Sequence, residues 1–115
     1  MVNYNKIIGN IGENNAIKYL IDNGFTILER NYRYKRCEID IIAQKDNHIH
    51  FIEVKKRKNN IFGYPEEFVS EKQKERIKLA AEDYIFKINW NNKILFDIIS
   101  IETYKDDIKI FIDAF

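Results

Sequence analysis

A chain of 115 residues is long enough for one folded domain, residues 1–115, and short for two. Its hydrophobic fraction of 45% argues against disorder, and its net charge of +1 argues against a polycation that coats nucleic acid through bulk charge. The single cysteine, Cys37, excludes an internal disulfide, and two histidines with one cysteine cannot by themselves complete a four-ligand zinc site. No signal peptide or membrane-length apolar run is visible, so we expect a cytoplasmic protein without a membrane partner.

The first half of the chain predicts one helix followed by three strands. Apolar residues recur at helical spacing from about residue 5 to residue 21, and Asn23-Gly24 is a typical helix stop. Segments rich in isoleucine and aromatic residues then predict strands over residues 25–34, 37–44 and 48–56.

The second half predicts a helix and two further strands. After an expected loop over residues 57–67, Ser70 and Gln73 form a capping-box pattern at the start of a helix that ends near Asn89. Two apolar segments then predict strands over residues 94–101 and 108–114. The order αβββαββ predicts a single α/β domain in which helices flank one mixed sheet.

The second and third strands form the most informative segment, because Asp46-Asn47 is typical of a two-residue hairpin turn. The register follows by counting outward from that turn. The expected cross-strand pairs are Lys45 with His48, Ile41 with Ile52, Ile39 with Val54, Ile42 with Phe51, Asp40 with Glu53 and Glu38 with Lys55. One sheet face would then be apolar, and the other would end in opposed carboxylates.

Opposed carboxylates at Asp40 and Glu53 would lie about 5 Å apart at Cβ, where like charges are destabilising. A proton, a basic neighbour or a metal ion must neutralise such a pair, and carboxylate oxygens suit Mg²⁺. Lys55 points to the same face as Glu53 because strand side chains alternate, so it could orient a water or offset charge on a phosphate. The alternative is a solvated network of surface ion pairs.

Two basic segments could contact nucleic acid. In the first, Arg30, Arg33, Lys35 and Arg36 alternate with Tyr32 and Tyr34, whose rings could stack on bases. The second comprises residues 55–58 and includes Lys56 and Arg57. The alternative for the first segment is an edge strand protected by charge.

Other polar residues have structural interpretations. We expect His48 and His50 to be surface histidines without further metal ligands, and Cys37 to be a small, partly buried side chain. Asp97 interrupts an apolar strand and is expected to accept structural hydrogen bonds. We expect Glu38 to pair with Lys55 or with a nearby arginine.

These residues resemble a known nuclease signature. Asp40 followed by Glu53-Val54-Lys55 resembles the PD-(D/E)xK nucleases, and the whole chain is similar to the UPF0102 (YraN-like) family of bacterial proteins described as endonucleases. The segments that carry this resemblance are Gly12-Glu13, Ala16, Tyr19-Leu20, Arg30-Asn31-Tyr32-Arg33, Glu38-Ile39-Asp40-Ile41-Ile42-Ala43, Phe51-Ile52-Glu53-Val54-Lys55, Phe62-Gly63, Pro65, Phe96-Asp97 and Ala114-Phe115. One departure is Cys37, where the family usually has glycine.

The resemblance implies a restriction-endonuclease-like core and hydrolysis of phosphodiester bonds in DNA or RNA, with branched or structured DNA as one candidate substrate. Mg²⁺ or Mn²⁺ would be bound by Asp40, Glu53 and the carbonyl of Val54. Lys55 would position or help to deprotonate the attacking water, and Glu13 would approach the same site from the first helix. The expected nucleic-acid-binding residues are Arg30, Arg33, Arg36, Lys56, Arg57 and Lys72.

Two other functions are compatible with the sequence. The chain could be a nucleic-acid-binding module of the same fold without turnover. It could also be an interaction domain that forms a homodimer through its apolar C-terminal strand, Ile108 to Phe115.

Overall fold

The computed structural model describes the backbone of residues 4–57, 69–102 and 107–115, and the side chains of residues 12–56, 69–102 and 107–115. Its elements are α1 (Tyr4–Asp22), β1 (Thr26–Tyr34), β2 (Cys37–Lys45), β3 (His48–Arg57), α2 (Glu71–Lys87), β4 (Ile94–Glu102) and β5 (Asp107–Phe111). The predicted αβββαββ order is confirmed. The last strand was predicted to reach residue 114 but ends at Phe111, because the chain turns there through Asp113, whose φ is +56°.

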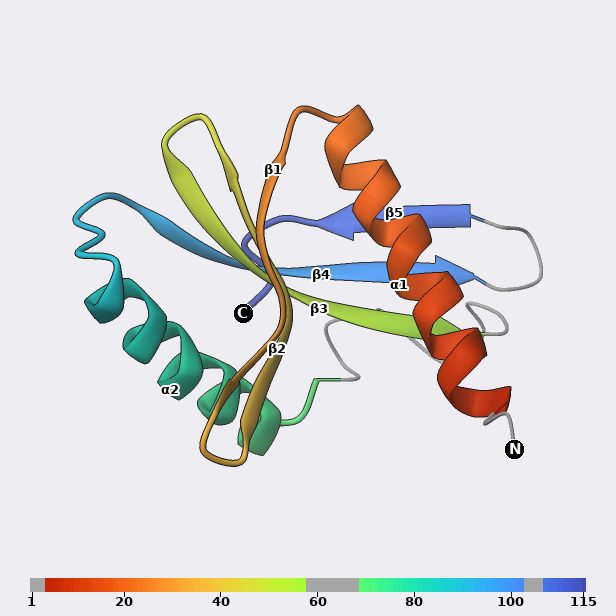
Figure 1. Cartoon of the computed structure of the whole chain (residues 1–115), viewed down its shortest axis with the longest axis horizontal. Helices are drawn as coiled ribbons and strands as arrows, with labels where there is room; N and C mark the ends of the chain where they lie inside the picture. The colour runs from red at the N-terminus through yellow and green to blue at the C-terminus, as the bar shows by residue number, and fades with distance from the viewer. Residues whose placement is uncertain (1–3, 58–68, 103–106) are drawn as a thin grey trace.

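Five strands form one mixed sheet in the order β1-β2-β3-β4-β5. β3 and β4 are parallel and are joined through α2, whereas the other neighbouring pairs are antiparallel. Figure 1 shows α1 crossing one side of this sheet and α2 lying beside the β1–β2 hairpin. Neither of these helices is long and apolar enough to cross a membrane.

The two helices cover opposite faces of the sheet, because adjacent strand residues belong to two different cores. Ile42, Phe51 and Ile98 pack with the buried residues of α2. Ile41, Ile52 and Ile99 pack with Ala16 and Leu20 of α1. Both faces of the central strands are therefore covered.

The predicted turn between β2 and β3 is confirmed. Asp46 and Asn47 have φ values of +50° and +64°, as both central residues of a type I′ turn require. Lys45 accordingly pairs with His48, and the ladder continues to Ile41 opposite Ile52.

Beyond Ile41 the hairpin departs from the predicted register. The β2–β3 ladder ends at Ile41 and Ile52, and Ile39 packs in the α2 core instead of beside Ile41. On the opposite side of β2, the β1 register passes from Arg30–Ile41 to Tyr32–Ile39, and the intervening Asn31 has a φ of +52°. The strand alternation is thus broken at Asp40.

Asp40 explains how this break is stabilised. Its Oδ2 accepts a hydrogen bond of 2.8 Å from the backbone N–H of Val54 in β3. A side chain therefore replaces a ladder carbonyl at this point. The predicted cross-strand pairs Ile39–Val54, Asp40–Glu53 and Glu38–Lys55 are wrong as ladder partners, because β2 leaves β3 here.

A buried His–Asp pair corrects the prediction for His50. Its Nδ1 lies 2.5 Å from Oδ2 of Asp97, and both side chains are buried. The ring packs edge-on against Phe25, so His50 is a core residue and not a surface histidine. Asp97 also accepts the backbone N–H of Asp113, which confirms its structural role and fixes the C-terminal turn to β4.

Candidate active site

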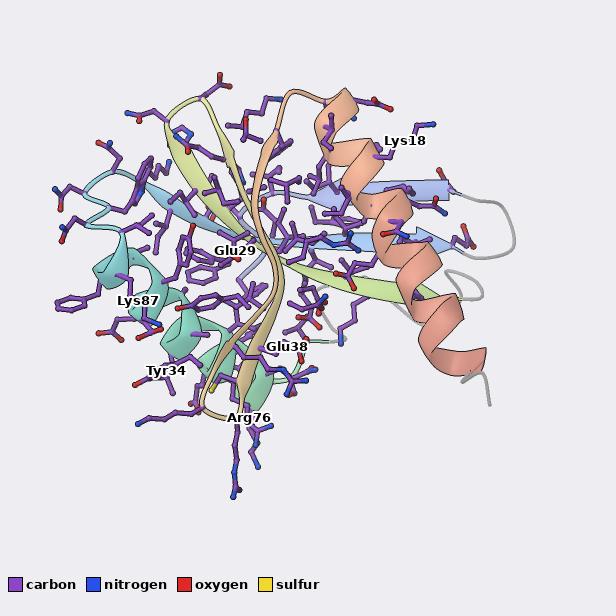
Figure 2. The ribbon with its side chains drawn as sticks, in the orientation of Figure 1. Lys18, Glu29, Tyr34, Glu38, Arg76 and Lys87 are labelled. Atoms are coloured by element: carbon purple, nitrogen blue, oxygen red, sulfur yellow. The ribbon has the colours of Figure 1, made fainter. Side chains whose placement is uncertain are left out.

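Asp40 and Glu53 line one cavity of about 220 Å³. β2 contributes Asp40 and Glu38, and β3 contributes Glu53. The turn that follows β1 contributes Arg36, and α2 forms the opposite wall with Gln73, Arg76 and Ile77. Figure 2 shows Glu38 and Arg76 at the same end of the molecule, where the β1–β2 hairpin meets α2.

α2 is placed at this cavity by its own N-terminal signal. The Ser70 side chain accepts from the Gln73 backbone N–H at 3.1 Å, and the Gln73 side chain accepts from the Ser70 backbone N–H at 3.2 Å. This capping box, predicted from the sequence, satisfies helix N–H groups that would otherwise lack partners. One turn further along, Ile77 is buried against the sheet and holds the neighbouring Arg76 at the cavity.

Burial perturbs both carboxyl groups of the cavity. It raises the pKa of Glu53 to about 7, and the charge of Asp40 raises it in the same direction. Burial is also the main cause that raises the pKa of Asp40, and the Val54 N–H opposes it. The two side chains therefore lie close enough to repel each other in a poorly solvated place.

Lys55 partly offsets this repulsion. Its Nζ lies 3.6 Å from Oε1 of Glu53, and both side chains are largely buried, with exposed fractions of 23% and 14%. The ammonium lowers the pKa of both Glu53 and Asp40. The predicted register placed Lys55 opposite Glu38. In the structure Lys55 instead pairs with Glu53 of its own strand, and Glu38 pairs with Arg33.

Glu13 approaches the site from α1 through a network that sequence reasoning missed. Its Oε1 accepts from Asn31 Nδ2 at 3.0 Å and from Arg30 Nε at 3.4 Å, and Arg30 also donates to Asn14 at 2.8 Å. The charge of Glu13 contributes to the raised pKa of Asp40, although Glu13 is not among the residues that line the cavity. The left-handed backbone at Asn31 aims its amide at Glu13, and an Asn within a strand pattern is the signal that could have indicated it.

The predicted basic residues have different surroundings in the structure. Arg36 lines the cavity, whereas Arg33 is exposed and lies 3.6 Å from Glu38, and Arg30 is engaged by α1. The stem of Lys56 lies across Gly12 of α1, so closely that a Cβ at Gly12 would displace it. Lys72 is exposed near the start of α2.

Two further expectations concern aromatic residues and the loop. Tyr32 is half-buried, donates to Asp83 of α2 at 2.5 Å and packs edge-on against Tyr84, so its ring is held by the core and does not present a free stacking face. The side chain of Arg57, with Phe62-Gly63 and Pro65, lies outside the described residues. Cys37 is buried, where a partly buried side chain was expected.

Gln73 and Arg76 are cavity residues that the sequence interpretation did not assign to the site. Gln73 was recognised only as a capping residue, and Arg76 was not singled out. Their spacing of three places them on the helix face that also carries Ile77, which is the signal that could have indicated them.

The oxygen ligands at this cavity are few. Among the described side chains, no cluster of three or more His, Cys, Asp or Glu residues could hold a metal ion. Three carboxylates line the cavity, and one of them, Glu38, pairs with Arg33. The backbone N–H of Val54 donates to Asp40. A cation here would need backbone oxygen, water or a ligand oxygen to complete its coordination.

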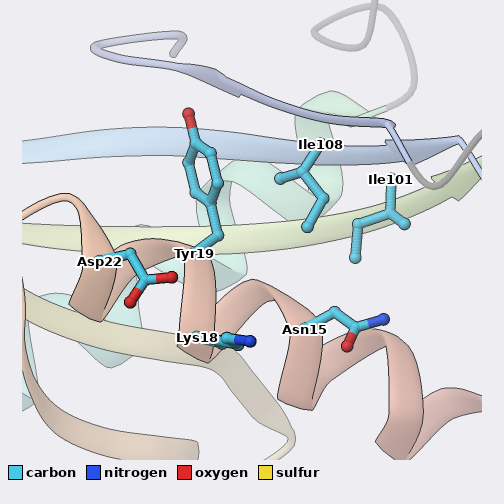
Figure 3. A pocket seen from close by; sticks show the side chains of 6 residues that line it. All are labelled: Asn15, Lys18, Tyr19, Asp22, Ile101 and Ile108. Atoms are coloured by element: carbon cyan, nitrogen blue, oxygen red, sulfur yellow. The ribbon is translucent and has the colours of Figure 1, made fainter.

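A second hollow lies on the α1 side of the sheet. It has a volume of about 350 Å³ and is lined by Asn15, Lys18, Tyr19, Asp22, Ile101 and Ile108. Figure 3 shows these side chains between α1 and strands β4 and β5. None of the carboxylates of the first cavity contributes to it.

Comparison with known proteins gives one consistent result. A family model described as "Uncharacterised protein family UPF0102" matches residues 12–101. A UPF0102 protein of Clostridioides difficile (strain 630) is 46% identical over 112 residues, which cover 96% of this chain and 98% of the relative. UPF0102 proteins of Clostridium tetani (44% over 120 residues; 100% and 98%) and Cytophaga hutchinsonii (45% over 93 residues; 81% and 82%) are also similar. These names state no activity.

Proposed function

This chain belongs to the UPF0102 family, and we propose that it is a divalent-metal-dependent endonuclease that hydrolyses phosphodiester bonds in nucleic acid. The observation that carries the proposal is the convergence of Asp40 and Glu53 on one cavity, with Lys55 3.6 Å from Glu53.

Two repelling carboxylates in a poorly solvated place destabilise a fold, and such perturbed pairs concentrate at functional sites. A divalent cation would relieve the repulsion. Mg²⁺ is commonly held by one or two carboxylates together with waters and substrate phosphate oxygens, so the two-carboxylate donor set fits Mg²⁺ or Mn²⁺ without a third acidic ligand.

When bound, Mg²⁺ or Mn²⁺ would supply Lewis-acid polarisation of the phosphate and would lower the pKa of an attacking water. Asp40 and Glu53 would hold the ion, with the carbonyl of Val54 as a further ligand. The Val54 N–H restrains one oxygen of Asp40 and fixes the orientation of that carboxylate.

Two other side chains would act on the reactants. Lys55 places a positive charge beside the carboxylates, where it would orient the attacking water and stabilise negative charge developing on the phosphate. Glu13, held by Arg30 and Asn31, would bind a water of the same site.

The test is cleavage of branched, single-stranded and duplex DNA in Mg²⁺ or Mn²⁺ by the wild type and by Asp40→Asn. The amide keeps an oxygen that can accept from Val54 and removes the charge, so the fold should persist while cleavage falls roughly 100-fold or more. Lys18→Gln, on the α1 side of the sheet, is the matched control and should cleave like the wild type.

Mn²⁺ binding, measured by calorimetry, gives a second readout that should weaken in Asp40→Asn and persist in Lys18→Gln. If wild type and Asp40→Asn release identical traces of product, the activity comes from a contaminant and the proposal is wrong. Nucleic-acid binding that survives in Asp40→Asn, without cleavage by any form, would identify a binding module instead.

A further inference from the structure

The cavity has two chemically different walls. Its acidic wall is formed by Asp40, Glu53 and Glu38, and its donor wall is formed by Arg36, Arg76 and Gln73. The carbonyl oxygen of the Gln73 side chain is used by the capping box, so the amide NH₂ is the group that Gln73 can offer to a ligand.

Arg36 and Arg76 differ from the other arginines near the site. Arg30 pairs with Glu13 and Arg33 pairs with Glu38. Within residues 12–56, 69–102 and 107–115, neither Arg36 nor Arg76 forms an ion pair or a side-chain hydrogen bond, although carboxylates line the same cavity. Both arginines are exposed, so their guanidinium N–H donors are accessible to an anion that enters the cavity.

The backbones that carry these two arginines are held in place. Arg76 precedes Ile77, which is 4% exposed, on a helix with a complete capping box. Arg36 precedes the buried Cys37 and follows Lys35, whose φ of +56° closes the turn between β1 and β2. The two side chains therefore reach the cavity from separate, fixed elements, as Figure 1 shows for the hairpin and α2.

We propose that Arg36 and Arg76 form a phosphate clamp, which binds a backbone phosphate of the nucleic acid from both sides and delivers it to the Asp40–Glu53 pair. This inference rests on the proposed function. The planar guanidinium donates two parallel hydrogen bonds that match phosphate oxygens. A volume of 220 Å³ equals about seven waters at roughly 30 Å³ each, which is room for a phosphate and a hydrated cation.

The clamp reads the backbone and not the base, so it contributes affinity without sequence preference. It also links phosphate binding to the cation, because uncompensated carboxylates on the acidic wall repel the phosphate. By reciprocity, a divalent cation and the nucleic acid should each strengthen binding of the other.

The experiment measures fluorescence anisotropy of a labelled single-stranded DNA, and of the RNA of the same sequence, across a salt series in Ca²⁺. The proteins are wild type, Arg36→Gln, Arg76→Gln and the control Lys18→Gln, which removes the same charge on the α1 side of the sheet. Gln and Arg have similar helix propensities, so α2 should persist in Arg76→Gln, and circular dichroism checks this.

Each clamp variant should bind roughly tenfold more weakly at low salt, and its slope of log affinity against log salt should fall by about 0.7. Lys18→Gln should keep the wild-type slope. A change common to DNA and RNA identifies the phosphodiester as the ligand, whereas a change for RNA alone would overturn a clamp that reads only phosphate. Slopes in Arg36→Gln and Arg76→Gln equal to that of Lys18→Gln would also overturn the clamp.

These outcomes are separable from those of the proposed function. Binding is measured without turnover, so a protein that never cleaves but loses salt slope in both variants keeps the clamp and refutes the nuclease. If cleavage depends on Asp40 but both variants bind DNA like the wild type, the nuclease proposal is supported and the clamp is wrong.

Discussion

The two ends of the β2–β3 hairpin are held by different means. Near the turn, a regular ladder from Lys45–His48 to Ile41–Ile52 is covered on both faces by apolar side chains. Beyond Ile41 the ladder stops, and the Asp40 side chain supplies the acceptor for the Val54 N–H. The regular end contributes stability, whereas the open end gives up ladder pairing between β2 and β3 beside a polar cavity. This comparison predicts that substitutions at the two ends separate stability from function.

The largest expected effect is on stability, at the regular end. Phe51 is fully buried, stacks on Phe96 and packs edge-on against Tyr84, so Phe51→Ala should lower the free energy of unfolding by about 3–5 kcal/mol. Urea denaturation measures this. Asp40→Asn, at the open end, should unfold at the same or higher urea concentration. If Asp40→Asn lowers the free energy of unfolding as much as Phe51→Ala does, stability does not reside mainly at the regular end of the hairpin.

The next effect is a pH dependence at the open end. The folded state raises the pKa of Glu53 from 4.5 to about 7, so between these values the folded protein binds more protons than the unfolded chain. The free energy of unfolding therefore falls as pH rises from 4.5 to 7, because the buried Glu53 carboxyl becomes charged. Above pH 7 the folded protein carries the full cost of this buried charge.

Glu53→Gln removes that penalty. Without divalent cations, the variant should be more stable than the wild type at about pH 8.5, by at most about 3.5 kcal/mol for a shift of about 2.5 pKa units at about 1.4 kcal/mol per unit. The two proteins should converge near pH 4 (about the unperturbed carboxyl pKa), as urea melts across the range would show. A difference that stays constant with pH would contradict the burial of an ionisable group here.

The smallest effect concerns the network that holds Glu13. Arg30 is 41% exposed, so its ion pair with Glu13 is partly screened by solvent. Arg30→Gln should lower cleavage roughly tenfold, since a misplaced Glu13 loses its water but the acidic wall remains. Nucleic-acid affinity should stay near that of the wild type, because Arg30 is engaged by α1 and not by the cavity. Equal losses in affinity and cleavage would instead make Arg30 a binding residue.

The parts that were predictable from sequence depend on short-range rules. Asp46 and Asn47 tolerate the left-handed backbone of a type I′ turn, and Ser70 with Gln73 forms a capping box within four residues. Such features are decided by neighbours along the chain. The turn, the helix start and the first five pairs of the ladder followed from them.

The parts that were not predictable depend on partners from elsewhere. The ladder ends because Val54 on β3 donates to Asp40 and because Asn31 on β1 adopts a positive φ, neither of which follows from alternation within β2. His50 was assigned to the surface because its partner, Asp97, lies 47 residues away. Arg76 reaches the cavity only through the path of α2 between two parallel strands.

That crossover has a kinetic consequence. All three carboxylates of the acidic wall belong to the β2–β3 hairpin, and a hairpin closes within about 1–10 μs because its contacts are local. Gln73 and Arg76 of the donor wall lie on α2, within the connection from β3 to β4. The parallel pairing of β3 with β4 closes a much longer loop and is therefore slower. During refolding, amide protons of the β2–β3 turn region should gain protection before those of β4, so the acidic wall of the cavity is assembled before α2 adds Gln73 and Arg76.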